Sequence, residues 1–412
     1  MSLLQTKRDR ISKALCALTA TTILLVAVEG AAPTPAYAQA RTDMKQLDHA
    51  VPPGTRGTGF LVVYSMPGAT RDKVSASALV FLPKGEPPEG GWPVAVWFHG
   101  NTTPGSSKCA PSLWPEFDGG LTASGFKSDY DFQISSLVNS GYAVVAPDYE
   151  GLGANADSPY PGYYTKSLLN AGLFGLRAAR TLYPSLSNRY VAVGHSEGAK
   201  AVVAFDQFAR EASPSDLHHM GSVAVAPFSS IRALLQGLDQ ARAHVSQADL
   251  APVVATQNFL VAMLATSVRV QKPDYDLKNI MGPDLAALMP RLRDLCTGPA
   301  IQAVTAAVVD KGVDQFKGVR DGWIDDPTMA QFLKANDPAE MDNLTVAKPM
   351  LVMGGTKDNF VPAGPLTSLV DKLRGKGADI RLNVMTDGDH FSLLRGEQPE
   401  ILEFIGEAFH GE

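Results

Sequence analysis

Three polar residues of this 412-residue chain lie in short motifs that together could hydrolyse an ester or amide bond. Ser196 is at the centre of segment 194–198, Gly-His-Ser-Glu-Gly, and Asp358 and His390 follow it in that order. A serine hydroxyl attacks a carbonyl carbon when an imidazole accepts its proton and a carboxylate holds that imidazole in the productive tautomer. We therefore predict a catalytic triad with Ser196 as nucleophile, His390 as base and Asp358 as acid.

The residues around Ser196 predict a sharp turn between a strand and a helix. The β-branched run 189–193 precedes it, and segment 199–209 follows with helical spacing of Ala, Val and Phe. Gly194 and Gly198 fit such a turn, since it strains the serine backbone and brings neighbouring backbone close. An ordinary Gly/Ser surface turn is the alternative, because Gly-x-Ser-x-Gly also arises by chance.

The contexts of the acid and the base agree with these roles. Asp358 follows an apolar strand-like run and precedes Val-Pro, and His390 follows the last predicted strand. A solvated aspartate and a structural histidine are the alternatives. Asp387 and Asp389 lie next to His390 and are competing carboxylates. Their spacing also resembles a fragment of a calcium loop, but no further ligands follow.

The tetrahedral intermediate of acyl transfer carries an oxyanion, which needs backbone donors aimed at it. We predict that one donor is the amide of Glu197, the residue after the nucleophile. The second should come from the loop after strand 94–98, where Asn101 is favoured and Gly100 and Thr102 remain alternatives.

The other histidines give no metal signature. We expect His195 to pack inside the turn and the adjacent pair His218 and His219 to lie in a solvated loop. No zinc-type Cys/His pattern, Gly-rich phosphate loop or paired-carboxylate motif stands out. We therefore predict neither a metal nor a cofactor.

Short apolar runs alternate with amphipathic segments along most of the chain, which favours a mostly parallel sheet covered on both faces. The predicted strands are 59–65 and 74–82, an antiparallel pair, followed by 94–98, 142–146, 189–193, 221–226, 349–353 and 380–385. The predicted helices of this part are 131–140, 168–183, 199–209 and 398–409.

The alternation stops at residue 228 and resumes after 346. Segment 228–346 has helical stretches, including the strongly apolar 252–270, and no clear strand. We predict an inserted helical cap at 228–346, between the two parts of the core at 39–227 and 347–412. Its apolar helices could form the core of a small domain or a dry pocket for an acyl chain, and both interpretations stay open.

The first residues have the pattern of a secretory signal peptide. A basic head precedes the apolar stretch 14–28, and small residues follow at Ala36, Ala38 and Ala40. We predict a signal peptide at 1–38, with cleavage after Ala38 or Ala40 and a secreted or periplasmic mature protein. A permanent membrane anchor is the alternative, although the apolar run is short for a bilayer.

Composition and cysteine content agree with an exported globular protein. The net charge of −6 and pI of about 5.8 do not suggest nucleic-acid binding. Cys109 and Cys296 are the two cysteines outside the signal segment, and we predict a disulfide between them. Two unpaired buried thiols are the alternative.

Nucleophile, acid and base follow one another in the order of α/β-hydrolases. Several segments make the chain resemble the secreted α/β-hydrolases of the secretory lipase (fungal lipase A-like) family. They are 99–103 (His-Gly-Asn-Thr-Thr), 109–112 (Cys-Ala-Pro-Ser), 145–153 (Val-Ala-Pro-Asp-Tyr-Glu-Gly-Leu-Gly), the Ser196 turn, Asp358 and His390.

This resemblance implies an α/β-hydrolase fold with a helical cap and no cofactor. It implies a secreted lipase or esterase that acts through an acyl-enzyme on small-molecule or lipid esters, with transient contact between the cap and a lipid interface. A serine exopeptidase or acyltransferase on the same fold, and a non-catalytic binding protein, are the alternative functions.

Overall fold

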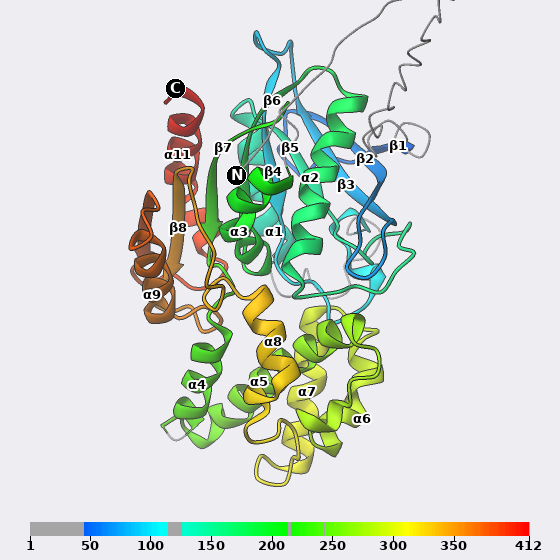
Figure 1. Cartoon of the computed structure of the whole chain (residues 1–412), viewed down its shortest axis with the longest axis vertical. Coiled ribbons are helices and arrows are strands. Elements are labelled where there is room, and N and C mark those ends of the chain that lie inside the picture. Colours follow the sequence, from blue (N-terminus) through cyan, green and yellow to red (C-terminus); the bar gives the residue numbers. More distant parts are fainter. Residues whose placement is uncertain (1–44, 114–125, 213–215, 243, 412) are drawn as a thin grey trace, which may run out of the picture. The chain divides into compact units, whose positions relative to one another are not determined.

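A central sheet organises the protein, whose computed structural model describes residues 45–113, 126–212, 216–242 and 244–411. The strands are β1 (Lys45–His49), β2 (Gly57–Met66), β3 (Val74–Pro83), β4 (Trp92–Phe98), β5 (Ala143–Pro147), β6 (Leu186–His195), β7 (His218–Val225), β8 (Met350–Gly355) and β9 (Ile380–Met385). They are arranged in the order β1-β2-β3-β5-β4-β6-β7-β8-β9 (Figure 1). β1, β2, β3 and β5 pair antiparallel, and the pairs from β5 to β9 are parallel.

Strand β4 shows why the sheet is buried on both faces. Val94, Val96 and Phe98 pack with the helices of one face, and Ala95 and Trp97 pack on the other. Successive side chains of a strand point to opposite faces, so an unbroken apolar run requires cover on both. The helices on the first face are α2 (Thr165–Leu182), α3 (Glu197–Ala212) and α9 (Ala363–Arg374), and those on the second are α1 (Phe126–Asn139) and α11 (Gln398–His410).

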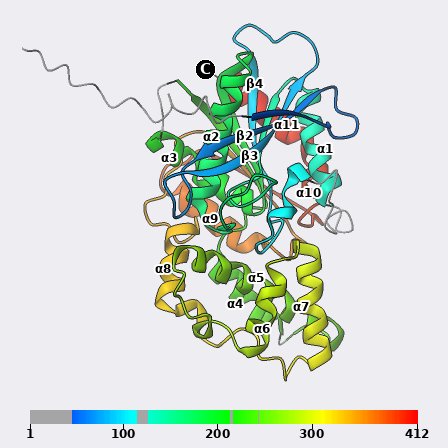
Figure 2. The same cartoon turned by 90° about the vertical axis from the view of Figure 1, so that its right-hand side faces the viewer.

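A helical insertion separates β7 from β8. It contains α4 (Ile231–Arg242), α5 (Gln247–Gln271), α6 (Pro283–Leu292), α7 (Thr297–Lys311) and α8 (Pro327–Asn336). Figures 1 and 2 show these helices gathered at one end of the sheet. The predicted fold class, a mostly parallel α/β sheet with an inserted helical cap, is confirmed.

Segment Leu250–Gln271 of helix α5 is long and apolar enough to cross a membrane, and it is the one such helix in the described part of the chain. However, 83% of its most apolar stretch is buried inside the structure. Burial of this kind is typical of the central helix of a soluble bundle, and α5 packs against α4 and α7.

The two ends of the insertion are fastened together by Asp337. Its Oδ1 accepts hydrogen bonds from the Ser229 hydroxyl at 2.7 Å and the Ser230 amide at 2.9 Å. Its Oδ2 accepts one from the Ile231 amide at 2.8 Å, in the first turn of α4. The boundaries predicted at 227/228 and 346/347 fall in connecting segments on either side of this point.

Two sequence expectations differ from the structure. β1 was not predicted: it is a largely exposed edge strand paired with β2, and its polar sequence has no buried face to give an alternating signal. His218 and His219 do not lie in a solvated loop, since they begin β7. His219 is buried, with Nδ1 3.3 Å from Asp206 and Nε2 3.2 Å from the Ser222 hydroxyl.

Cys109 and Cys296 form a disulfide. Cys109 lies in the segment after β4, and Cys296 immediately precedes α7, so the bond joins the core to the insertion across 187 residues of sequence. Both residues are buried. The predicted signal peptide lies outside the described residues.

Replacing both cysteines with alanine should lower the free energy of unfolding by about 2–4 kcal/mol, because the unfolded chain loses a long covalent loop. Urea unfolding at neutral pH measures this change. Wild-type protein unfolded in excess reducing agent is the control and should match the double variant. Equal free energies of unfolding for the oxidised wild type and the double variant would contradict the stabilising disulfide between Cys109 and Cys296.

Candidate active site

Ser196 occupies a strained turn between β6 and α3. Its φ is +55°, a left-handed value that non-glycine residues rarely adopt. A Cβ at Gly198 would lie 2.3 Å from the carbonyl oxygen of Phe98, and one at Gly194 would lie 2.8 Å from the backbone of Gly198. Glycine is therefore required at both positions, and the turn projects the half-buried Ser196 above the sheet.

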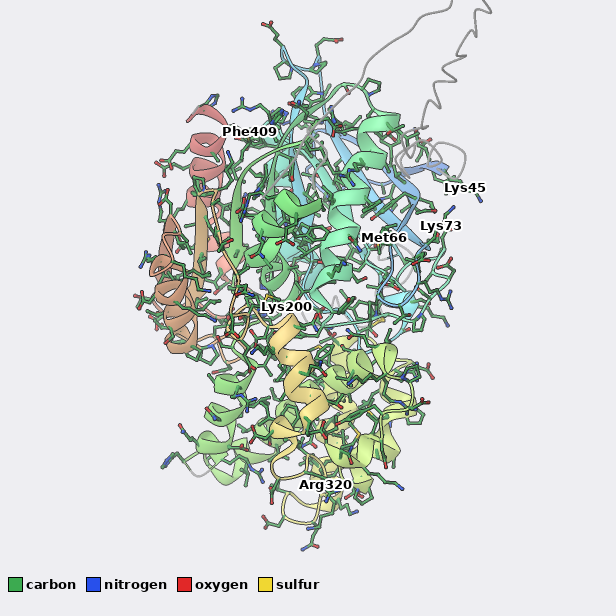
Figure 3. The ribbon with its side chains drawn as sticks, in the orientation of Figure 1. Lys45, Met66, Lys73, Lys200, Arg320 and Phe409 are labelled. Carbon is green, nitrogen blue, oxygen red and sulfur yellow. A yellow bond between two sulfur atoms is a disulfide. The ribbon has the colours of Figure 1, made fainter. Side chains whose placement is uncertain are left out.

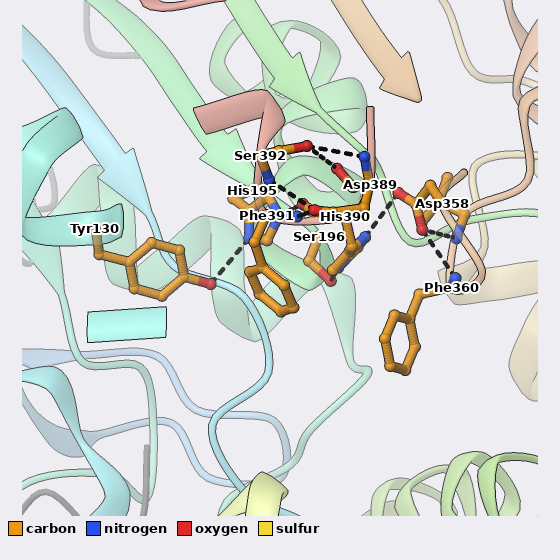
Figure 4. A network of polar contacts seen from close by, with 10 residues as sticks. Tyr130, His195, Ser196, Asp358, Phe360, Asp389, His390, Phe391 and Ser392 are labelled. Carbon is orange, nitrogen blue, oxygen red and sulfur yellow. Dashed lines mark hydrogen bonds and ion pairs between the residues drawn. The ribbon is translucent and has the colours of Figure 1, made fainter. Parts of the chain in front are cut away.

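The structure brings the three predicted triad residues into one hydrogen-bonded row (Figure 4). The Ser196 Oγ lies 2.9 Å from His390 Nε2, and His390 Nδ1 lies 2.8 Å from Asp358 Oδ2. In this arrangement the serine hydroxyl donates to Nε2 and the Nδ1–H donates to the carboxylate. The row can therefore move the serine proton to the imidazole.

Asp358 is held by the backbone that follows it. Its Oδ1 accepts hydrogen bonds from the amides of Phe360 and Val361, both at 2.8 Å. The competing carboxylates have other partners. Asp387 pairs with Lys357, and Asp389 accepts from the amides of Phe391 and Ser392, which lower the pKa of Asp389. Asp358 is thus the carboxylate that contacts the His390 ring.

His195 and Tyr130 form a second set of hydrogen bonds that holds the backbone of His390. His195 Nε2–H donates to the backbone oxygen of His390 at 2.8 Å, and the Tyr130 hydroxyl lies 2.9 Å from His195 Nδ1 (Figure 4). Burial lowers the pKa of His195 well below its ordinary value, with the nearby His390 adding to the effect. A neutral His195 therefore accepts from the tyrosine and fixes the His390 backbone. Tyr130 was not found from sequence, because nothing in its local context distinguishes it from a core aromatic.

The candidate oxyanion donors lie on two neighbouring turns. The Gly100 amide already donates to the Tyr130 hydroxyl at 3.0 Å. Thr102 is buried and does not line the cavity beside Ser196, whereas Asn101 does. Glu197 begins α3, where an amide has no acceptor within its own helix. The geometry favours Asn101 and Glu197 over the two alternatives.

An apolar cavity of about 50 Å³ adjoins Ser196 and His390. It lies between the carboxyl ends of the strands and the inserted helices, with α5 and α7 contributing side chains. Its large apolar lining residues are Phe228, Phe259, Leu260, Met263, Ile301, Phe360 and Phe391. Such a surface suits a hydrocarbon group next to the reacting carbonyl. Within the described ranges, no group of three His, Cys, Asp or Glu side chains could hold a metal ion.

A buried lysine lies one turn beyond the nucleophile. Lys200 on α3 is fully buried, and its Nζ donates to the Tyr163 backbone oxygen at 2.7 Å and lies 3.4 Å from the centre of the Tyr163 ring. Figure 3 places Lys200 close to where α8 meets the core. Burial lowers its pKa to about 7, although the carboxylates of Glu197 and Asp337 raise it.

A protein-family model matches most of the chain. The model described as the alpha/beta hydrolase family matches residues 95–402, which include the Ser196, Asp358 and His390 positions. No curated protein sequence matches the chain significantly.

Solved structures share the fold at low sequence identity. Candida antarctica lipase A superposes with a TM-score of 0.68 and 18% identity, over 89% of this chain and 81% of that one. A hydrolase described as putative from Legionella pneumophila gives 0.67 and 18%, over 86% and 90%. The rice cell wall degrading esterase LipA from Xanthomonas oryzae gives 0.65 and 17%, over 90% and 98%.

Lys200 predicts a specific pH dependence of stability. Above about pH 7 the folded protein loses this proton, whereas the unfolded chain keeps it to near pH 10, so rising pH favours the folded state. Relative to Lys200→Met, the wild type should gain about 1 kcal/mol of unfolding free energy per pH unit between about pH 7 and pH 9.

Chemical unfolding at several pH values tests this expectation. Lys166→Met, at an exposed position of α2, is the matched control. Parallel stability curves for the wild type and Lys200→Met would show that Lys200 keeps its proton in the folded state throughout this range.

Proposed function

Because this chain belongs to the alpha/beta hydrolase family, we propose that it is a secreted carboxylic-ester hydrolase, a lipase or esterase that works through an acyl-enzyme. The observation that carries the proposal is the hydrogen-bonded row of Ser196, His390 and Asp358 beside an apolar cavity. The similarity in fold to Candida antarctica lipase A and to the Xanthomonas esterase LipA supports the same class of reaction.

In the proposed mechanism, Ser196 Oγ attacks the ester carbonyl while its proton passes to His390 Nε2. Asp358 stabilises the resulting imidazolium and keeps the ring oriented. The amides of Glu197 and Asn101 stabilise the oxyanion. His390 then protonates the leaving alcohol, and water, deprotonated by the same imidazole, releases the acid from Ser196.

The proposed substrates are small-molecule or lipid esters, without cofactor, metal or nucleic acid. The cavity has a volume of about 50 Å³, so a short acyl chain fits inside it, whereas a longer chain extends out of the cavity or displaces side chains of α5 or α7. Transient contact of the insertion with a lipid interface belongs to the same proposal, since the inserted helices cover the site.

Ser196→Ala should reduce ester hydrolysis by about 10⁴-fold or more, and Asp358→Asn by about 10³–10⁴-fold. Hydrolysis of a p-nitrophenyl ester series measures this, and a fluorophosphonate should label Ser196, as mapped by mass spectrometry.

We expect acetate and butyrate esters to react faster than laurate and palmitate esters, because the cavity beside Ser196 is small.

The same assays separate the alternatives. Faster cleavage of amides than esters would favour an exopeptidase, and transfer to alcohols in preference to water an acyltransferase. A folded protein that neither labels at Ser196 nor hydrolyses any ester would favour a binding protein.

Export gives an independent prediction. The first 38 residues combine a basic head, an apolar stretch and small residues before Gln39. Expression with its own N-terminus should therefore give an extracellular or periplasmic protein beginning at Gln39 or Arg41, as determined by intact mass. A membrane-bound product of full length would instead favour the anchor.

A further inference from the structure

The side chain of Asn101 is held by three different parts of the molecule. Its Nδ2 donates to the Thr103 carbonyl at 3.1 Å and to Glu197 Oε2 at 3.2 Å. Its Oδ1 accepts from the hydroxyl of Thr297 at 2.8 Å. One amide oxygen and both amide hydrogens are thereby used, which leaves a single orientation for this side chain.

Thr297 belongs to the insertion, yet it lies against the loop after β4. It is the first residue of α7, and its amide donates to the Thr102 carbonyl at 2.9 Å. Its hydroxyl also lies 3.2 Å from the Asn101 carbonyl oxygen. Thr297 therefore contacts both the backbone and the side chain of Asn101.

The residues just before Thr297 fasten this contact in place. The Thr103 hydroxyl donates to the Leu295 carbonyl at 2.8 Å. Cys296, between Leu295 and Thr297, is joined to Cys109 by the disulfide. Segment 295–297 thus runs alongside loop 101–103, and the two residues before Thr297 are each bonded to the chain that follows β4.

Glu197 holds Asn101 from the opposite side. Its side chain is fully buried, and Oε2 also accepts from the Tyr160 hydroxyl at 2.7 Å. Under the mechanism above, the backbone amide of Glu197 is one oxyanion donor, so the same residue supplies one donor and fixes the neighbour that carries the other.

We propose that Thr297 is a positioning residue: its hydroxyl, supplied by the inserted helices, sets the backbone of Asn101 so that the Asn101 amide faces the oxyanion. The inference rests on the proposed function and assigns the insertion a part in transition-state stabilisation. Thr297 also lines the cavity beside Ser196, and the effect proposed for its hydroxyl passes through Asn101.

The expected effect follows from how oxyanion donors work. An aligned donor strengthens as charge develops on the oxygen, so its displacement lowers kcat more than it raises KM. Loss of a whole donor costs about 10²–10³ in kcat. A misplaced donor retains part of its effect, and we expect Thr297→Val to lower kcat about 10–100-fold with KM within about twofold.

The test compares Thr297→Val, Thr297→Ser and wild type in hydrolysis of p-nitrophenyl acetate. Serine keeps the hydroxyl and should retain kcat within about threefold of the wild type. The control is Thr305→Val, the same substitution on the same helix, where the hydroxyl donates to the Ile301 carbonyl of its own helix at 2.9 Å. Its kcat and KM should match the wild type.

A tetrahedral adduct provides a second readout. Phenylboronic acid bound to Ser196 places an oxygen where the oxyanion forms, so its inhibition constant should rise by about the same factor as kcat falls in Thr297→Val. A purely structural role for Thr297 would lower the melting temperature without this selective loss. If the valine variant does not fold, Thr297→Ala enters the same comparison.

A double variant tests the route of the effect. Asn101→Ala keeps the backbone amide and removes the side chain that Thr297 holds. Adding Thr297→Val to it should then reduce kcat by less than the product of the two single losses.

Unchanged kcat and boronate inhibition in a folded Thr297→Val or Thr297→Ala variant, or full multiplicativity in the double variant, would overturn the inference while leaving the esterase proposal intact. Failure of the proposed function itself would be seen first in the wild type, as absence of ester hydrolysis and of Ser196 labelling.

Discussion

The close approach of α3 to the end of β4 is the constraint on which this site depends. β4 and β6 are parallel neighbours in which Phe98 pairs with Gly194, so the carboxyl ends of both strands lie side by side at the same edge of the sheet. The turn after β6 then passes so near the Phe98 and His99 carbonyls that no side chain fits at Gly198. This contact sets Ser196 beside the Asn101 loop, and both candidate oxyanion donors follow from it.

Sequence was most informative where a residue type is forced by the local backbone. The Gly-x-Ser-x-Gly turn, the apolar strands and the acid and base loops each leave a pattern, because glycine, alternation and chain order have physical causes within a few residues. The predicted fold class followed from these patterns. The disulfide was predicted because two cysteines lie outside the predicted signal segment of the chain.

The features that were not predicted are contacts between residues that lie far apart in the sequence and belong to no recognisable motif. Tyr130, Tyr160 and Thr297 lie far in sequence from the residues they hold, and each is a common residue in an amphipathic or irregular context. His219 was misplaced because adjacent histidines suggest solvent, while burial between Asp206 and Ser222 satisfies the ring. Asn101 was already favoured from sequence, and the hydrogen bond of the Gly100 amide to Tyr130 adds a structural reason to prefer it over Gly100.

Asp337 has a consequence for how this molecule could change over evolution or by engineering. By accepting three hydrogen bonds from the chain at the start of α4, it closes the insertion at its base. Ser196 lies before the insertion in the chain, and Asp358 and His390 lie after it. The inserted helices could therefore be exchanged as a unit without changing the distances between these three side chains. Such an exchange is restricted where the insertion remains bound to the core, including the short segment around Cys296, Ser267 of α5, which accepts from the Tyr163 amide, and Asn336 of α8, which accepts from the Thr165 amide. A graft that keeps the Asp337 contacts but omits the segment around Cys296 would retain Ser196, Asp358 and His390. In such a protein, the range of substrates and the rate of turnover could be changed independently of each other.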